Sequence, residues 1–206
     1  GAPNIDPVTR RSERIAQQQV ADVSLGKALQ QWPTDPVKAA INKELTNLAV
    51  NLASWQYVHS TTEIVGAKTS QVINAKLSLK QKVDVHNNTT YKARLCVLGN
   101  LLPETMYSPM ETSNSTVHYS SIIMQLHIAM NRDLKIESFD IPAAYLTCKL
   151  KQPYAMRISK TIAPYLIIAD PRAQEFLQKD GSILVQLNAT LYGLKESGQI
   201  FGDHLR

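Results

Sequence analysis

The sequence predicts a fold of the α+β class, in which helices and mainly antiparallel strands share a core. Three observations support this prediction. With 44% apolar and 19% charged residues over 206 positions, the chain has the length and composition to bury a core. Apolar residues recur at helical spacing in some stretches and alternate in others. There is no regular succession of strand, helix and strand, which disfavours a doubly wound parallel sheet.

Residues 1–33 are expected to form a basic tether. They carry Arg10, Arg11 and Arg14 together with a run of glutamines and prolines, and no apolar period is sustained. The arginine pair could contact phosphate, and a solvated linker is the simpler interpretation.

A scaffold helix is predicted to follow the tether. Asp35 can cap its first turn, and Pro36 suits the first helical position. Apolar residues then recur every three to four positions, which predicts one buried face. They are Val37, Ile41, Leu45, Leu48 and Leu52.

Residues 72–98 are expected to form a β-hairpin, with residues 86–90 as its turn. The hairpin and the residues just before it, 68–98, carry six basic residues against a single acid, Asp84. The basic residues are Lys68, Lys76, Lys80, Lys82, Lys92 and Arg94. Two interpretations remain open for this excess of positive charge, a solvated face or a flap that grips phosphate groups.

The second half of the chain predicts further elements. A helix is expected from about Ser113 or Ser115, and Pro142 should end a strand over residues 134–141. Strands are expected at residues 154–159 and 182–187, a helix over 169–179, and a last helix from Ser197. The buried stripe of the helix near residue 120 is expected to consist of Tyr119, Ile122, Ile123, Leu126 and Met130.

Asp140 is the strongest candidate for chemistry. Polymerases clamp the reacting oxygens with two divalent cations, and Mg²⁺ prefers carboxylate ligands. At the end of the predicted strand, Asp140 is placed to offer one such carboxylate. Tyr145 follows five residues later, where its ring could exclude a ribose 2′-hydroxyl. The alternative is that Tyr145 packs into the core.

Five motifs occur in order along residues 36–206. They are Ala-Ala-Ile-Asn-Lys-Glu-Leu at 39–45, Tyr-Lys-Ala-Arg-Leu at 91–95, Tyr-Ser-Pro at 107–109, Phe-Asp-Ile-Pro-Ala-Ala-Tyr-Leu at 139–146 and Leu-Tyr-Gly-Leu-Lys-Glu-Ser at 191–197. In this order and spacing they resemble the reverse transcriptase region of copia-type long-terminal-repeat retrotransposon polyproteins. The resemblance implies a right-hand polymerase with fingers over 34–110, a partial palm carrying the first catalytic motif over 111–149, and a return to the fingers with a truncated palm helix over 150–206. The thumb is expected to be absent.

The resemblance also implies roles for individual residues. Asp140 would be the first catalytic carboxylate and a Mg²⁺ ligand, with the Ile141 carbonyl available to the metal. Tyr145 would be the sugar gate. Lys92 and Arg94 would hold the incoming triphosphate, either of them could make the key contact, and Lys80 or Lys82 could share the role. The loop under the nascent base pair would contain Tyr192, Gly193 and Lys195. The nucleic acid would lie along Lys76, Lys80 and Lys82.

The chain also departs from the family pattern. No Asp-Asp dipeptide occurs in the 206 residues, and Glu196 stands where glutamine is usual, adding negative charge near a phosphate path. Since a two-metal site needs several carboxylates, we expect this chain alone not to polymerise. The parent reaction would be templated DNA synthesis, with a template–primer, nucleoside triphosphates and the remainder of the polymerase as partners. The alternative is a domesticated module that binds nucleic acid or another protein.

The remaining expectations concern compartment and redox state. Cys96 and Cys148 match no metal spacing and are expected to be free, buried thiols. No signal peptide or spanning apolar run is present, so an intracellular protein is expected, cytoplasmic in a virus-like particle or nuclear, with no membrane partner.

Overall fold

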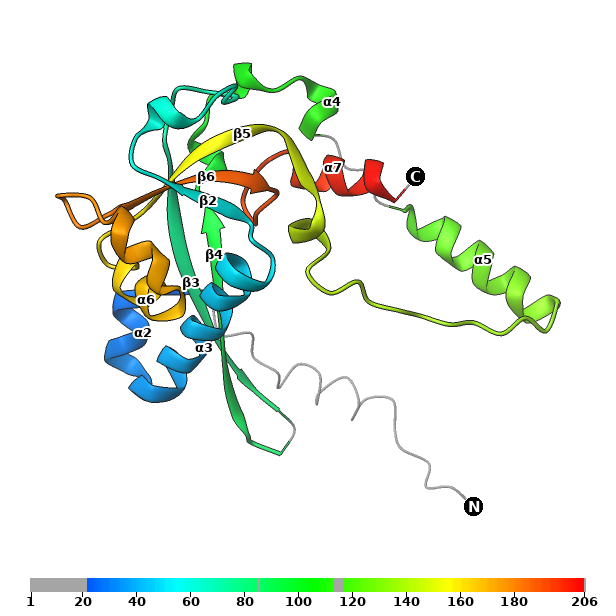
Figure 1. Cartoon of the computed structure of the whole chain (residues 1–206). Coiled ribbons are helices and arrows are strands. Elements are labelled where there is room, and N and C mark those ends of the chain that lie inside the picture. Colours follow the sequence, from blue (N-terminus) through cyan, green and yellow to red (C-terminus); the bar gives the residue numbers. More distant parts are fainter. Residues whose placement is uncertain (1–21, 85, 113–116, 206) are drawn as a thin grey trace.

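A mixed sheet forms the centre of the fold, as the computed structural model describes it for residues 22–84, 86–112 and 117–205 (Figure 1). Within these residues the sheet has six strands in the order β1-β3-β5-β6-β2, and β4 pairs with β3. The β3–β5 pairing is parallel, whereas the other pairings are antiparallel. The strands are β1 Val23–Ser24, β2 Trp55–Val58, β3 Ile73–Val83, β4 Thr89–Val97, β5 Lys149–Ile158 and β6 Ile183–Ala189. Helices beside such a sheet are consistent with the α+β class.

The predicted β-hairpin is confirmed as β3 and β4. Alternation along both strands sends Leu77, Leu79 and Leu95 into the core. The turn begins at Asp84, whose carboxylate accepts hydrogen bonds from the backbone N–H groups of His86 and Asn88, both at 2.8 Å. These local hydrogen bonds stabilise the turn between the two strands.

The first helices cover one side of the hairpin. Helix α3 (Thr34–Thr46) continues into a π-helical turn, η1 (Asn47–Asn51), and the predicted residues Val37, Ile41 and Leu45 are fully buried. The predicted cap is wrong, because Pro33 occupies the N-cap position and no side chain caps the helix. The tether prediction is wrong for its last third, since β1 pairs with β3 and α2 spans Leu25–Gln31. The rest of the tether, with Arg10, Arg11 and Arg14, lies outside the described residues.

The C-terminal part agrees with several predictions. Strands β5 and β6 and helix α7 (Ser197–His204) form where strands and a helix were expected. The helix predicted over residues 169–179 is wrong, because helix α6 (Ala163–Ala169) ends there and a 3₁₀ helix, η6 (Pro171–Phe176), follows. Asp170 interrupts the helix because its carboxylate accepts the N–H of Arg172 at 3.2 Å. The shorter elements are η2 Thr61–Glu63, η3 Gly99–Leu101, η4 Glu104–Met106, α4 Pro109–Thr112 and η5 Ala144–Thr147.

Helix α5 (Tyr119–Asn131) departs most from expectation, since it projects away from the sheet (Figure 1). It starts at Tyr119, and the predicted start at Ser113 or Ser115 lies outside the described residues. The predicted buried stripe is wrong, because all five of its residues are exposed and only Ala129 is buried. The predicted strand over residues 134–141 is also wrong, since no described strand pairs with this extended segment. A strand requires a hydrogen-bonding neighbour, which periodicity alone does not supply.

One hydrophobic core connects regions far apart in sequence. Leu45 of α3, Leu95 of β4 and Leu187 of β6 belong to the same buried cluster. The predicted fingers segment 34–110 and the returning segment 150–206 therefore share a single sheet. The division into fingers and partial palm, with residues 111–149 between them, stays a prediction. None of the described helices has the length and apolar character to cross a membrane.

Candidate nucleic-acid interface

The β3–β4 register places five cations on one face of the hairpin. Lys80 lies opposite Lys92, and Ser78 lies opposite Arg94. Because side chains on paired strands alternate between faces, all of these point away from the leucine side. We call this surface the basic face, and it consists of Lys76, Lys80, Lys82, Lys92 and Arg94. Opposed like charges are unfavourable in an isolated hairpin, so the face suits an anionic partner.

Two carboxylates border the basic face. Among the described residues its only ion pair joins Lys80 Nζ to Asp22 at 3.5 Å, and both side chains are substantially exposed. Glu44 lies near Arg94 and accepts the backbone N–H of Leu95 at 3.1 Å. Burial raises the pKa of Glu44, while the Leu95 hydrogen bond and the Arg94 charge oppose that shift. The basic face therefore carries more positive than negative charge.

A row of aromatic rings continues from the basic face. The Arg94 guanidinium lies 5.3 Å from the centre of the Tyr192 ring. Tyr192 meets Tyr145 edge-on at 6.4 Å, and Tyr145 meets Phe201 of α7 at 5.6 Å. The structure thus brings together three predicted site residues, Arg94, Tyr145 and Tyr192. Cations beside half-buried rings form the kind of surface on which nucleotides stack.

Tyr145 is anchored by its backbone. It lies in η5, and the Thr190 hydroxyl donates a hydrogen bond to its carbonyl oxygen. The preceding Ala143 adopts a left-handed conformation with φ 55°, which turns the chain from the extended segment into η5. The ring is therefore held by contacts on both sides, so it packs partly into the fold, as the alternative interpretation expected.

Gly193 lies where two backbone segments approach closely. The Val97 N–H donates to the Tyr192 carbonyl at 2.8 Å, which joins the loop to the outer edge of β4. Gly193 has φ +95°, and a Cβ atom there would lie 2.0 Å from the Val97 carbonyl oxygen. A glycine is therefore required by the protein's own packing. Its role beneath a base pair stays a prediction.

Lys195 lies beside a partly buried ionic cluster, and Glu196 is a member of that cluster. Lys195 Nζ is 5.6 Å from the Tyr107 ring centre and 4.0 Å from Glu104. Lys68 Nζ contacts Glu196 at 2.6 Å and Glu111 at 2.9 Å. We call Lys68, Tyr107, Glu111, Tyr154 and Glu196 the Lys68 cluster.

The Lys68 cluster corrects the expectation for Glu196. Its side chain is only 8% exposed, and Tyr154 donates a hydrogen bond to it at 3.2 Å. Burial alone would lower the pKa of Lys68, but its hydrogen bonds to Glu196 and Glu111 outweigh burial and raise that pKa. Glu196 is thus an internal residue that is ion-paired with Lys68, rather than a free charge on the surface.

Asp140 and Ile141 lie outside these arrangements. Both are exposed in the extended segment after α5, and no hydrogen bond or ion pair of a described residue involves Asp140. Across the described residues, no three His, Cys, Asp or Glu side chains group to hold a metal ion. The described carboxylates therefore do not fit a two-metal site, and Mg²⁺ binding stays a prediction.

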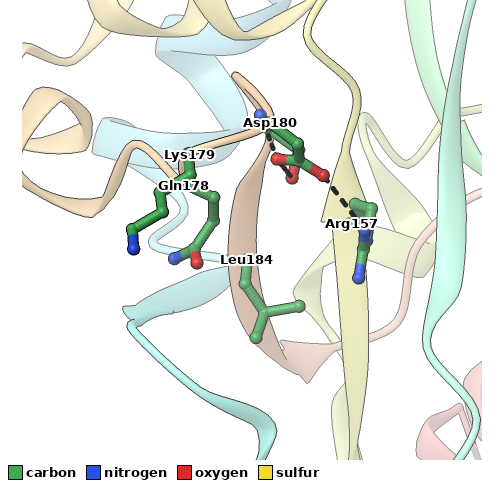
Figure 2. Close-up of a pocket in the computed structure, with 6 residues that line it drawn as sticks. Arg157, Gln178, Lys179, Asp180 and Leu184 are labelled. Atoms are coloured by element: carbon green, nitrogen blue, oxygen red, sulfur yellow. Dashed lines mark hydrogen bonds and ion pairs between the residues drawn. The ribbon is translucent and has the colours of Figure 1, made fainter.

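A surface pocket lies near the turn before β6, at a different place from the predicted site (Figure 2). Arg157 of β5 and Asp180 form an exposed ion pair in it, at 3.3 Å. Its other lining residues are Gln178, Lys179, Ser182 and Leu184. No predicted site residue lines this pocket.

The sequence did not predict the site contacts of five residues, which are Phe201 in the aromatic row and Lys68, Tyr107, Glu111 and Tyr154 in the Lys68 cluster. Tyr107 belongs to the Tyr-Ser-Pro motif, which was a usable signal. No local pattern indicates the role of Lys68, because its partner Glu196 lies 128 positions away in the sequence. Both cysteines are free, as expected, although Cys96 is only half-buried.

Comparisons with known proteins point to a mobile element. The chain is 30% identical over 128 residues to the Transposon Ty1-ER2, Ty1-MR2 and Ty1-H Gag-Pol polyproteins of Saccharomyces cerevisiae. The aligned region covers 62% of this chain and 6% of each polyprotein. No protein-family model matches the chain, and no solved structure matches it either. The similarity supports an origin in a retrotransposon Gag-Pol polyprotein.

Proposed function

We propose that this chain is the fingers and partial palm of a copia-like retrotransposon reverse transcriptase, and that its basic face binds the phosphates of a template–primer. The motif order and the similarity to Gag-Pol polyproteins support the first part. The second part is supported by the pairing register of β3 and β4, which aligns five cations on one exposed face of the hairpin.

The chemistry of binding follows from the two kinds of group at the interface. Lysines of the basic face neutralise backbone phosphates and release counterions, so affinity falls as salt rises. Arg94 adds a planar guanidinium suited to phosphate oxygens, and Tyr192 and Tyr145 offer rings for stacking. Such an interface contacts both the phosphates and the bases of an extended nucleic-acid strand. This binding requires no catalytic metal.

The double variant K76E/K82E should weaken binding to a short primer–template at least tenfold. Both lysines are exposed on the basic face, and reversing them removes two phosphate contacts. The slope of log affinity against log salt should become shallower by about 2, at roughly 0.9 per contact. Fluorescence anisotropy measures both the affinity and its salt dependence when the titration is repeated between about 50 and 200 mM salt.

The matched control is K38E/K179E, which changes net charge equally at exposed positions outside the basic face. This control should keep most of the affinity and the salt slope. An equal loss in the two variants would mean that net charge alone attracts the nucleic acid, and the proposed interface would be abandoned.

A primer-extension assay tests the expected inactivity. This chain with template–primer, deoxynucleotides and Mg²⁺ should give no extension above a protein-free control, because the described carboxylates do not form a metal cluster. Extension by the parent chain would refute inactivity, and its loss in the Asp140→Asn variant would show that the reaction requires the Asp140 carboxylate.

The exposed helix α5 favours a second candidate, a domesticated protein-interaction module. Association that is insensitive to salt and leaves the basic face unused would support this candidate over the polymerase fragment.

A further inference from the structure

Strand β3 has an open stretch on the side that faces away from β4. The Leu98 N–H donates to the Asn74 carbonyl at 3.0 Å, so the even-numbered residues of β3 direct their backbone groups toward β4. The odd-numbered residues direct theirs to the other side, where β5 pairs no further along than Asn74 and β1 begins to pair only at Ser78. Leu77 lies between these two pairings. Its backbone N–H and C=O therefore point into a gap in the sheet, and neither has a hydrogen-bond partner among the described residues.

A cavity of about 690 Å³ lies at this gap, where α2, β3 and the start of α6 meet (Figure 1). Small-molecule sites take roughly 300–1,000 Å³. Two exposed lysines line the cavity, Lys76 of β3 and Lys160 of the loop before α6, and neither has an ion-pair partner among the described residues. The apolar walls come from Leu25, Leu29, Leu98, Ile162 and Tyr165.

The groups around the cavity are complementary to a nucleotide. Its apolar walls and the Tyr165 ring suit the faces of a base, and the two lysines suit the phosphates. The Leu77 N–H and C=O supply one donor and one acceptor, which the edge of a base can satisfy. An acyl chain would match the walls, but it would leave both backbone groups buried without partners. An added peptide strand does not fit, because β5 and β1 close the gap at both ends within fewer residues than an ordinary strand has.

We propose that this cavity takes up one unpaired base of the nucleic-acid strand whose phosphates lie on the basic face. Lys76 connects the two sites, because it belongs to the basic face and also lines the cavity. Lys160 contacts the strand on the other side of the bound base. This inference rests on the proposed function of the basic face. It adds a base-binding pocket at the β3 edge of the hairpin, whereas Tyr192 adjoins the opposite edge, formed by β4.

Two single strands of equal length test the proposal, one of thymidines and one in which abasic sites replace the thymidines. In fluorescence anisotropy the parent should bind the thymidine strand on the order of tenfold more tightly. Gly26→Phe should remove most of this preference, because nothing lies within 4 Å of the place of a Cβ atom at this cavity-lining position and the added ring can fill the cavity. Gln30→Phe is the matched control at an exposed position of α2 outside the cavity lining, and it should keep the preference.

The salt dependence separates this inference from the proposed function. Both phenylalanine variants leave the basic face intact, so they should keep the parent's slope of log affinity against log salt. A parent that binds neither strand would overturn the proposed function and the base pocket together. Salt-dependent binding with an equal preference for thymidine in Gly26→Phe and Gln30→Phe would support the basic face and would overturn the base pocket.

Photocross-linking locates the bound base. A thymidine strand with a single 5-iodouracil base should cross-link to Tyr165 on irradiation, and mass spectrometry of the digested protein identifies the residue. Lys160→Glu should reduce this cross-link on the order of tenfold. Lys179→Glu is the matched control, since Lys179 is exposed and lies outside both the cavity and the basic face. Cross-links found only at Tyr145 and Tyr192 would place all bound bases on the aromatic row and would overturn the proposal.

Discussion

Truncating Glu196 to alanine should lower the free energy of unfolding by about 3–5 kcal/mol, the cost of breaking a buried ion pair from one side. The side chains of Lys68 and Glu196 are only 11% and 8% exposed, and their contact is 2.6 Å. Removing the carboxylate leaves the Lys68 ammonium poorly hydrated, and it also leaves the Tyr154 hydroxyl without its acceptor on Glu196. Glu111 keeps part of the charge compensated, which favours the lower end of this range.

Urea denaturation followed by tryptophan fluorescence measures this loss. Glu196→Gln preserves the shape and the oxygen that accepts from Tyr154, so it should cost less than Glu196→Ala. Arg157→Ala removes an exposed ion pair, visible in Figure 2, and should cost less than about 1 kcal/mol. If Glu196→Ala cost no more than Arg157→Ala, the Lys68 cluster would not stabilise the fold.

The double variant Lys68→Met/Glu196→Leu tests whether the effect of Glu196 on stability depends on its pairing with Lys68. Because it removes both charges together, it should be more stable than Glu196→Ala. An additive loss in this double variant would contradict direct coupling of the two groups.

Replacing Gly193 with alanine should destabilise the protein by about 3 kcal/mol, through a steric clash added to backbone strain. The new Cβ atom would lie 2.0 Å from the Val97 carbonyl oxygen, which is part of β4 and cannot rotate away. The chain also has φ +95° at this residue, which L-residues rarely adopt. The loop and the edge of β4 would therefore have to separate.

Gly66→Ala is a matched control for Gly193→Ala. Gly66 has φ +70°, and nothing lies within 4 Å of the place that a Cβ atom would take there, so only the conformational cost of about 1 kcal/mol remains. Equal losses of stability at the two positions would show that the clash with Val97 is absent. A larger loss at Gly193, accompanied by weaker nucleic-acid binding, would connect this packing to the position of Tyr192.

Local patterns in the sequence predicted the elements whose stability is local. The β3–β4 hairpin was predicted because its alternation and its polar turn act between residues that are close in sequence. The buried face of α3 was predicted for the same reason, since 3.6-residue periodicity directly encodes it. The roles assigned to Asp140, Lys92 and Lys195 through the resemblance remain predictions.

Partners distant in sequence explain the errors. Nothing in a local window distinguishes an apolar helix that packs from one that stays exposed, so the buried stripe of α5 was mispredicted. The strand at residues 134–141 had suitable residues but no pairing neighbour among the described strands. The tether was mispredicted because β1 and α2 are held by contacts with β3, which periodicity within residues 1–33 does not reveal.

Spacing along the chain was enough to predict the basic hairpin, the buried face of α3 and the order of the motifs, because each of these depends on residues that are close in sequence. One shared face for Lys76, Lys80, Lys82, Lys92 and Arg94 could be established only from the folded chain, since it depends on the register between two strands. The ion pair between Lys68 and Glu196 likewise follows from the folded chain, because the two residues are 128 positions apart in the sequence. Charge in a sequence is a property of single residues, whereas burial and pairing are properties of the folded chain.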